Sequence, residues 1–434
     1  MTEIQTHAER RARLLAQMQC GIAVVPTAPE RLRNRDSAYL YRFDSYFYYL
    51  CGFREPESVL VLIAGAEPQS ILFCREKNLE REIWEGFRFG PEEAKKAYGV
   101  DAAYPISQLD EKLPSLMANQ PALYYAPGAD PDWDARVMRW LNQVRAQSRL
   151  GVSVPQNIHD IRSLLDEMRL VKDGHELGIM RRAASISAKA HERAMRATRP
   201  GRMEYEIEAE LQYEFRRHGA QFPAYWPIVA GGANACVLHY NENSARLEDS
   251  GLLLVDAGCE LDGYASDITR TWPINGTFSG AQKDIYELVL AAQAAAIDAT
   301  GPGIAWDAPH EAAVRVLAQG MIDSGLCQGS LDKVIEAGDY KRFYMHRTGH
   351  WLGLDVHDAG EYKLAGNWRP LREGMTLTVE PGCYIRAADD VPKAYWNIGV
   401  RIEDNVLVTR DGCEVITAET PKSVAAIESI VGHG

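Results

Sequence analysis

Residues 251–273 read GLLLVDAGCELDGYASDITRTWP and place two aspartates, Asp256 and Asp267, within β-rich sequence. Asp262-Gly263 between them is a strong signal for a tight hairpin turn. A two-residue loop at 261–262 would set the aspartates directly opposite each other, whereas a loop at Asp262-Gly263 would make them diagonal neighbours. In either register both carboxylates lie on one face, within reach of a shared cation. Taken alone, the pair is more simply explained as two solvent-facing aspartates.

Two later β-rich segments each carry a glutamate. Glu380 ends the run MTLTVE and precedes Pro381-Gly382, and Glu403 lies in GVRIEDNVLVT. A carboxylate beside an apolar run is costly to bury unless it is paired, hydrogen-bonded or bound to a metal. Arg401 precedes Glu403 by two residues, so in a strand the two side chains share a face. For that pair alone, a structural salt bridge is the simpler interpretation.

The stretch HRTGHWLGLDVHD at 346–358 holds three of the chain's eleven histidines, His346, His350 and His357. It lacks the H-E-x-x-H pattern of zinc-peptidase helices. Clustering still favours a ligand role, because neutral imidazole is the commonest nitrogen ligand of metals. Two aspartates, two glutamates and one or more histidines fit a hard divalent ion such as Mn²⁺, and a pair of ions better than one.

These motifs resemble those of the proline-specific metallopeptidases of the creatinase/aminopeptidase family, which have the pita-bread fold. HRTGHWLGLDVHD is similar to the family's histidine signature, and VDAGCELDGYASDITRTWP, TVEPGCY and GVRIEDN are similar to its carboxylate motifs in order. Residues 33–63 and 167–183 resemble the N-terminal domain and the linker of aminopeptidase P. The resemblance implies an α/β (α+β) chain, with a smaller α/β creatinase-like domain at 1–170 and a pita-bread catalytic domain at 171–434.

The resemblance also implies a dinuclear metal site. Its ligands would be Asp256, Asp267, His350, Glu380 and Glu403. Asp267 and Glu403 would bridge two divalent ions, most simply Mn²⁺, while Asp256 binds one ion and His350 with Glu380 binds the other. Glu380 would also accept a proton during catalysis.

Further positions follow from the same resemblance. His239 would contact the substrate near the scissile bond, His357 would bind the scissile carbonyl region, and His346 would lie close by. Tyr384 and Arg401 match positions of the substrate pocket. Two residues of the N-terminal domain resemble residues near a cleft, which can be that of a neighbouring subunit; they are Asp36 and Trp84.

The activity implied is that of an Xaa-Pro aminopeptidase, which removes an N-terminal residue that precedes proline. A prolidase, which cuts only Xaa-Pro dipeptides, is the main alternative, and Arg386 could bind the carboxylate of a dipeptide. A non-catalytic pita-bread module that binds peptides and a metal-free amidinohydrolase are further alternatives. Both are disfavoured, because every one of the five ligand positions holds Asp, Glu or His.

Composition sets the remaining expectations. The chain has 434 residues and a net charge of −13, and such acidity disfavours a nucleic-acid partner. Its apolar runs are far shorter than the ~18–20 residues of a membrane span, and its charged N-terminus does not resemble a signal peptide. Eight scattered cysteines without a C-x-x-C pair indicate reduced thiols and a cytoplasmic location. Relatives by resemblance suggest a homotetramer, or alternatively a dimer.

Overall fold

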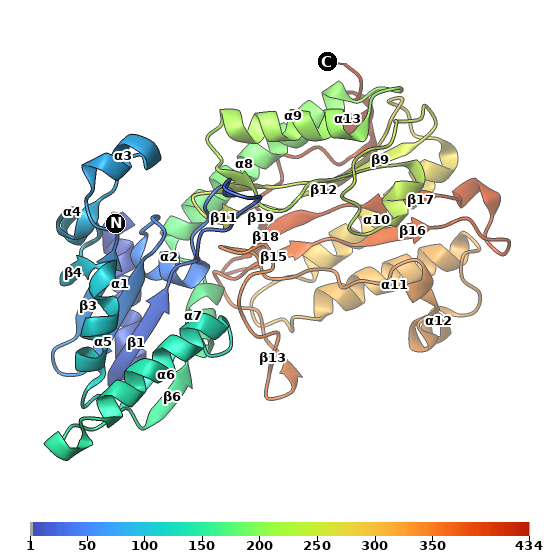
Figure 1. Ribbon diagram of the computed structural model, residues 1–434. Coiled ribbons are helices and arrows are strands. Elements are labelled where there is room, and N and C mark those ends of the chain that lie inside the picture. Colours follow the sequence, from blue (N-terminus) through green and yellow to red (C-terminus); the bar gives the residue numbers. More distant parts are fainter. Residues whose placement is uncertain (1–2, 434) are drawn as a thin grey trace. The chain divides into compact units, whose positions relative to one another are not determined.

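The computed structural model describes residues 3–433. They form two compact units, which meet in the sequence between Arg169 and Leu170. In Figure 1 the first unit runs from dark blue to teal and the second from green to red. Within residues 3–433, no helix is both long enough and apolar enough to cross a membrane.

The N-terminal unit is built on one mixed six-stranded sheet, in the order β4-β3-β2-β1-β5-β6. Its strands are β1 (Gly21–Pro26), β2 (Val59–Ala64), β3 (Gln69–Cys74), β4 (Ala102–Pro105), β5 (Ala122–Tyr125) and β6 (Asn157–Asp160). β2 pairs antiparallel with β1 and β3, whereas the outer pairings are parallel. Ile22, Val24 and Val61 lie in its core, since central strands are covered on both faces.

The described residues of this unit also form seven helices, which precede, connect or follow the strands. They are α1 (Glu3–Met18), α2 (Ser45–Cys51), α3 (Leu79–Glu85), α4 (Gly90–Tyr98), α5 (Leu109–Met117), α6 (Pro131–Arg145) and α7 (Arg162–Leu170). Pro131 begins helix α6, where Asp130 accepts hydrogen bonds from the amides of Asp132 and Trp133. Helix α3 differs from the others because none of its side chains is buried.

The C-terminal unit combines two helix pairs with small antiparallel sheets. Its helices are α8 (Gly174–Ala197), α9 (Glu204–Arg217), α10 (Gly280–Asp298), α11 (Ala308–Asp323), α12 (Leu331–Ala337) and α13 (Val424–Glu428). Helix α8 packs on α9 and α10 packs on α11, and the strands run between these pairs (Figure 1). Short 3₁₀ turns occur in both units, at Ile106–Gln108, Ser148–Leu150, Gly232–Cys236, Asp339–Arg342 and Lys393–Tyr395.

Three sheets of this unit position the candidate site. They are β12-β9-β8, β15-β18-β19 and β16-β17. Their strands are β8 (Ile228–Gly231), β9 (Leu252–Asp256), β12 (Thr269–Pro273), β15 (Thr376–Val379), β16 (Gly382–Ile385), β17 (Ile398–Arg401), β18 (Asp404–Val408) and β19 (Cys413–Val415). The smaller pieces are β7 (Phe222–Pro223), β10 (Cys259–Leu261), β11 (Tyr264–Ala265), β13 (Lys363–Leu364) and β14 (Asn367–Trp368).

The hairpin between the two aspartates has its turn at Asp262-Gly263. Leu261 pairs with Tyr264, and both turn residues have positive φ, 50° and 84°. Counting back along the ladder, Asp256 pairs with Thr269 rather than with Asp267. Of the two registers that the sequence allowed, the structure therefore has the one in which the aspartates are diagonal neighbours.

Helix α8 begins and ends where local signals place it. Asp173 and Glu176 form a capping box at its start, and the helix stops before Pro200-Gly201. The residue before this cap is anchored as well: Lys172 forms a buried ion pair with Asp358 at 2.8 Å. Its backbone amide donates to the carbonyl of Gly374. Asp358 directly follows His357 in the sequence, so this ion pair restrains the loop that carries His357.

Candidate active site

The candidate site is a cavity of about 650 Å³ in the C-terminal unit. It is lined by nine of the residues predicted from the sequence, namely His239, Asp256, Asp267, His346, His350, His357, Glu380, Arg401 and Glu403. These residues come from β9, β17, and the segments between strands. Tyr384 lies next to them, with its hydroxyl 2.8 Å from Nε2 of His346.

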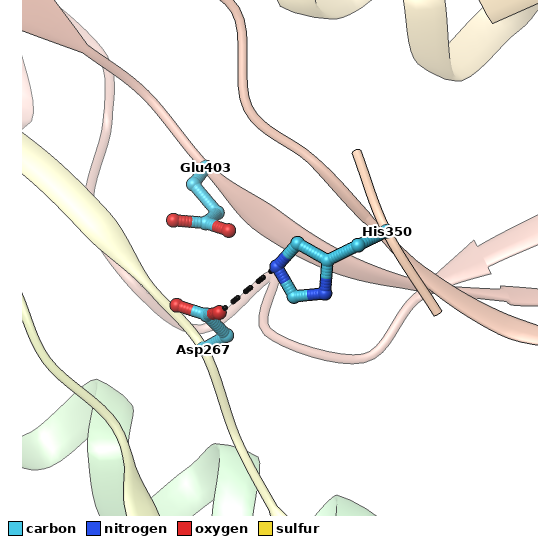
Figure 2. Close-up of side chains that lie close together, drawn as sticks. All are labelled: Asp267, His350 and Glu403. Carbon is cyan, nitrogen blue, oxygen red and sulfur yellow. Dashed lines mark ion pairs between the residues drawn. The ribbon is translucent and has the colours of Figure 1, made fainter. Parts of the chain in front are cut away.

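Three side chains form the centre of this cavity. Ligand atoms of Asp267, His350 and Glu403 all lie within 4.8 Å of one another, and Figure 2 shows the three side chains directed toward a common space. Nε2 of His350 lies 3.4 Å from Oδ2 of Asp267 and 3.7 Å from Oε1 of Glu380. Nδ1 of His350 donates to the carbonyl of Trp351 at 2.9 Å, which leaves Nε2 facing the carboxylates.

Burial and mutual repulsion control the charge of this cluster. Burial, reinforced by neighbouring carboxylates, raises the pKa of Glu380 to about 7 and that of Glu403 well above its usual value. Burial also raises the pKa of Asp256. Burial would lower the pKa of His350, but Asp267 and Glu380 raise it to about 9. Asp267 has a lowered pKa, because the hydrogen bond and charge of His350 outweigh its burial.

These residues fit divalent metal ions. Four carboxylates face one guanidinium and one imidazole, and buried negative charge of this density needs further cations to be stable. Carboxylate oxygens together with a single imidazole are the donors that hard to borderline divalent ions prefer. A thiol pair does not compete for this assignment, because the cavity is lined by no cysteine within residues 3–433.

Arg401 pairs with Asp256 rather than with Glu403. Its Nη2 donates to Oδ2 of Asp256 at 2.6 Å, and its Nε donates to Oγ1 of Thr269 at 3.0 Å. The salt bridge between Arg401 and Glu403 that the two-residue spacing suggested is therefore wrong. The reason is a break in the strand: β17 ends at Arg401 and β18 begins at Asp404, so Glu403 lies outside both ladders.

A chain of hydrogen bonds joins Arg401 to His346. Nη1 of Arg401 donates to the hydroxyl of Tyr384 at 3.1 Å, so this hydroxyl donates its own proton to Nε2 of His346 at 2.8 Å. His346 is then neutral with its proton on Nδ1, which donates to the carbonyl of Arg347. Burial and the charge of Arg401 agree with a neutral ring, since they lower the pKa of His346 to about 3.

Tyr225 is a site residue that the sequence did not reveal. Its hydroxyl lies 2.5 Å from Oδ1 of Asp267 and also contacts Oδ1 of Asp256, so it spans the two aspartates. Burial, followed by the charge of Asp256, raises its pKa well above the ordinary value and keeps it protonated as a donor. Tyr225 precedes Asp256 by 31 residues, and no spacing or motif in the surrounding FPAYWP marks it as a partner of carboxylates.

The remaining predicted residues fall into two groups. His239 and His357 are exposed on the cavity wall, and the ring of His357 lies 4.3 Å from that of His350, nearly at a right angle. Asp36 and Trp84 belong to the N-terminal unit, where both side chains are exposed. Their place near a cleft stays a prediction.

Backbone contacts hold the central residues in place. Asn405 accepts from the amide of Asp267 at 3.0 Å and donates to its carbonyl at 2.5 Å. Arg270 donates to the carbonyl of Glu403 at 2.5 Å and pairs with buried Asp404 at 2.7 Å. These contacts use the backbone of Asp267 and Glu403 and leave their carboxylates to other partners, such as Tyr225 at Asp267 and Thr269 at Glu403.

Comparison with known proteins identifies the family. Residues 178–410 match the model of metallopeptidase family M24, and residues 7–124 match that of the aminopeptidase P N-terminal domain. The chain therefore belongs to metallopeptidase family M24, as its motifs predicted.

Individual relatives show which members of this family the chain resembles. The chain is 45% identical to a Haemophilus influenzae Xaa-Pro aminopeptidase, over 98% of this chain and 96% of that protein. It is 52% identical to the solved structure of Pseudomonas aeruginosa aminopeptidase PepP, with a TM-score of 0.97 and coverage of 99% and 98%. A zinc-substituted Escherichia coli aminopeptidase P in complex with product matches with 42% identity, a TM-score of 0.96 and the same coverage. The predicted combination of an aminopeptidase P N-terminal domain and a pita-bread domain is confirmed by these matches.

Metal binding should stabilise the metal-free protein. Adding a divalent metal at about a hundred times its Kd should raise the free energy of unfolding by roughly 3 kcal/mol. The gain should be larger at pH 8 than at pH 6, because Glu380, with its pKa of about 7, binds a proton at the lower pH and protons compete with the metal. Thermal unfolding after chelation and metal addition measures this.

A matched pair of variants checks that the effect comes from the cluster. Glu403→Gln should lose most of the stabilisation, whereas Asp262→Asn, in the hairpin turn, should keep it. Asn tolerates the positive φ of residue 262, so the control removes a nearby charge without straining the backbone. Equal stabilisation of the two variants would contradict the metal site.

Proposed function

We propose that this chain is an Xaa-Pro aminopeptidase, a metal-dependent hydrolase that cleaves the peptide bond between an N-terminal residue and a following proline. One observation carries the proposal: an intact set of carboxylates and one imidazole converges in a single cavity. The full-length similarity to proteins named Xaa-Pro aminopeptidase supports the same activity. Peptides with proline in the second position are the substrates.

We assign the metal ligands as Asp256, Asp267, His350, Glu380 and Glu403, with Asp267 and Glu403 shared between two ions. When bound, such ions supply Lewis acidity and make a water molecule nucleophilic near neutral pH. Support for shared ligands comes from the position of Asp267 and Glu403 at the centre of the cavity, where each lies close to His350.

Glu380 moves the proton in this proposal. Its pKa is about 7 without metal, and bound ions would lower that pKa, so the group is an ionised carboxylate that can accept a proton from water and return it to the nitrogen of the leaving proline. Oε1 of Glu380 also accepts a hydrogen bond from Thr378 at 3.2 Å, which holds the carboxylate toward the cavity. The transfer matters for this substrate, because the nitrogen of an Xaa–Pro bond carries no proton before cleavage.

The histidines and the pocket residues orient the substrate. His357, whose pKa is lowered by partial desolvation and by His350, is neutral near pH 7 and can donate to the oxygen of the scissile carbonyl. His239 lies on the same cavity wall and contacts the substrate near the scissile bond. His346, Tyr384 and Arg401 form a fixed hydrogen-bonded wall against which the proline ring can pack.

Prolidase is the second candidate, and Arg386 is the residue that motivates it. The side chain of Arg386 is exposed and donates to the carbonyl of Cys236 at 3.0 Å, so it is partly engaged by the protein itself. It does not line the catalytic cavity. This placement favours the aminopeptidase over a dipeptidase whose arginine binds the substrate carboxylate.

Peptide length separates the two activities. We expect Ala-Pro-Ala to be cleaved after alanine with a kcat/KM at least tenfold above that for Gly-Pro, because the tripeptide occupies more of the cavity. Asp267→Asn and Glu403→Gln should each lower activity on both substrates by more than a hundredfold, since each removes a charge from the metal cluster. Chromatographic product assays measure this. Preferential cleavage of the dipeptide would establish a prolidase, and near-normal turnover of either variant with metal bound would refute the shared-ligand roles.

We further propose that the physiological ion is Mn²⁺. One imidazole among four carboxylates forms a set slightly softer than Mg²⁺ prefers, and Mg²⁺ also retains its water ligands more strongly. After chelation and verified removal of metal, Mn²⁺ should restore more activity than Mg²⁺ at equal free concentration. Full activity of the metal-free protein would contradict the metallopeptidase mechanism, and equal recovery with both ions would contradict the preference for Mn²⁺.

A homotetramer, or alternatively a dimer, is the assembly that we propose. Helix α3 and the residues after it expose a large apolar surface, formed by Leu79 (73% exposed), Ile83 (80%), Trp84 (86%) and Phe87 (60%). Exposed apolar clusters of this kind mark interaction surfaces, and aromatic residues are enriched there. In a tetramer Trp84, together with Asp36, could narrow the cleft of a neighbouring subunit, so that only an extended N-terminus enters.

Light scattering should give the mass of four chains. Ile83→Asp should lower that mass, because it places a charge within the exposed apolar surface of α3. Tyr205→Asp, at a position of α9 that is 54% exposed, should leave the mass unchanged. A monomer with full activity on Ala-Pro-Ala would refute this assembly.

We also propose a reducing, cytoplasmic location. Free thiols that are buried or partly buried at seven of the eight cysteines support it.

A further inference from the structure

Two arginines line the catalytic cavity, and they differ in how their donors are used. Arg401 is buried, and it donates to Asp256, Thr269 and Tyr384. Arg347, which follows His346 in the sequence, is exposed on the cavity wall. Within residues 3–433, the guanidinium of Arg347 makes no ion pair and no hydrogen bond. Its N–H groups are therefore not used by any other described residue, and Arg347 lines both the catalytic cavity and a second one.

The guanidinium of Arg347 is nevertheless held in place. It lies over the ring of Trp368, 4.8 Å from the ring centroid. Nζ of Lys363 lies 4.2 Å from the same centroid, and Lys363 pairs with Trp368 across the β13–β14 ladder. A cation–π contact is an attraction to the ring as a whole, and a guanidinium presents its N–H donors in a fork geometry that matches a carboxylate. Trp368 thus orients a cation whose donors have no partner in the protein.

The charge of the surroundings makes this arginine unusual. The chain has a net charge of −13, and the centre of the cavity consists of four carboxylates. An anionic group on a substrate is repelled by those carboxylates unless a cation receives it elsewhere in the cavity. Arg347 is the cation on the cavity wall, among the described residues, that has unused donors.

We propose that Arg347 binds a carboxylate on the residue that follows proline. This inference rests on the proposed function, because that function places the N-terminal amine and the scissile bond among the metal ligands. In an extended peptide the residue after proline then lies about 7 Å further along the chain. A cavity of about 650 Å³ is large enough to enclose a tripeptide. The carboxylate is either the terminus of a tripeptide or an acidic side chain at the third position.

Two pairs of peptides test the proposal and separate the two sources. Ala-Pro-Ala as free acid and as amide differ only in the terminal carboxylate, and Ala-Pro-Glu-amide and Ala-Pro-Gln-amide differ only in the side chain. In at least one pair, the wild-type kcat/KM should be about fivefold higher for the peptide with the carboxylate, the size expected for a partly exposed ion pair. The difference should reside in KM, because the carboxylate is remote from the reacting atoms.

Variants assign the preference to Arg347. In Arg347→Met the ratio of kcat/KM values within the responding pair should fall to near one, and Arg347→Lys should retain part of it. Arg315→Met is the matched control: Arg315 and Arg347 line a second cavity together, and Arg315 does not line the catalytic one. This control removes the same charge and should keep the wild-type ratio. Raising the ionic strength should also bring the wild-type ratio toward one.

The outcomes are distinguishable. A wild-type ratio near one in both pairs, or a ratio that Arg347→Met leaves unchanged, overturns the proposal while the aminopeptidase activity stands. A loss of the ratio in Arg315→Met as well overturns it too, because the preference would then follow the overall charge. Failure of the wild-type, metal-loaded protein to cleave any of the four peptides overturns the proposed function itself, and this inference with it.

Discussion

The structure depends on burying four carboxylates in one cavity. Asp256, Asp267 and Glu403 are buried and Glu380 is half-buried, and repulsion among like charges so close together is strong. Within the described chain, Arg401 and His350 are the cationic groups in direct contact with them. The raised pKa values of Glu380 and Glu403 express the remaining excess of negative charge. A cluster of this kind is stable in its ionised form only with metal ions among the oxygens.

The fold therefore has to hold the ligand residues through contacts outside the cavity, many of them with their backbone. Arg270 and Asn405 do so through the backbones of Glu403 and Asp267. Buried His191 contacts the carbonyl of Ala257 at 2.9 Å, next to Asp256. Backbone contacts of this type help to fix where the carboxylates point and do not themselves use the carboxylate oxygens. They also explain why charged residues such as Arg270 and Asp404 are buried outside the cavity: they support the ligands rather than bind the substrate.

The sequence was sufficient for the family and the architecture, and less so for the contacts. The hairpin and histidine motifs predicted which residues form the cavity. They could do so because short-range spacing and turn chemistry determine where a strand ends and therefore where its last side chain lies. The hairpin register stayed open until the turn at Asp262-Gly263 was seen in the structure. The prediction that Arg401 pairs with Glu403 was wrong. A break between β17 and β18 interrupts the two-residue period of a strand, and Arg401 pairs with Asp256 instead. Tyr225 could not be found, because only tertiary packing brings it to Asp256 and Asp267.

The buried residues of the cavity are linked by hydrogen bonds, whereas exposed residues on its wall are not. Arg401, Tyr384 and His346 are linked by hydrogen bonds, so a change in one alters the others and the ligand beside them. Trp226, which is 59% exposed, and Arg347 line the same cavity without such links, Arg347 resting only on an aromatic ring. Substituting an exposed residue of this kind costs little stability. The wall of the cavity can therefore change which peptides are bound, while the buried cluster continues to determine which bond is cleaved.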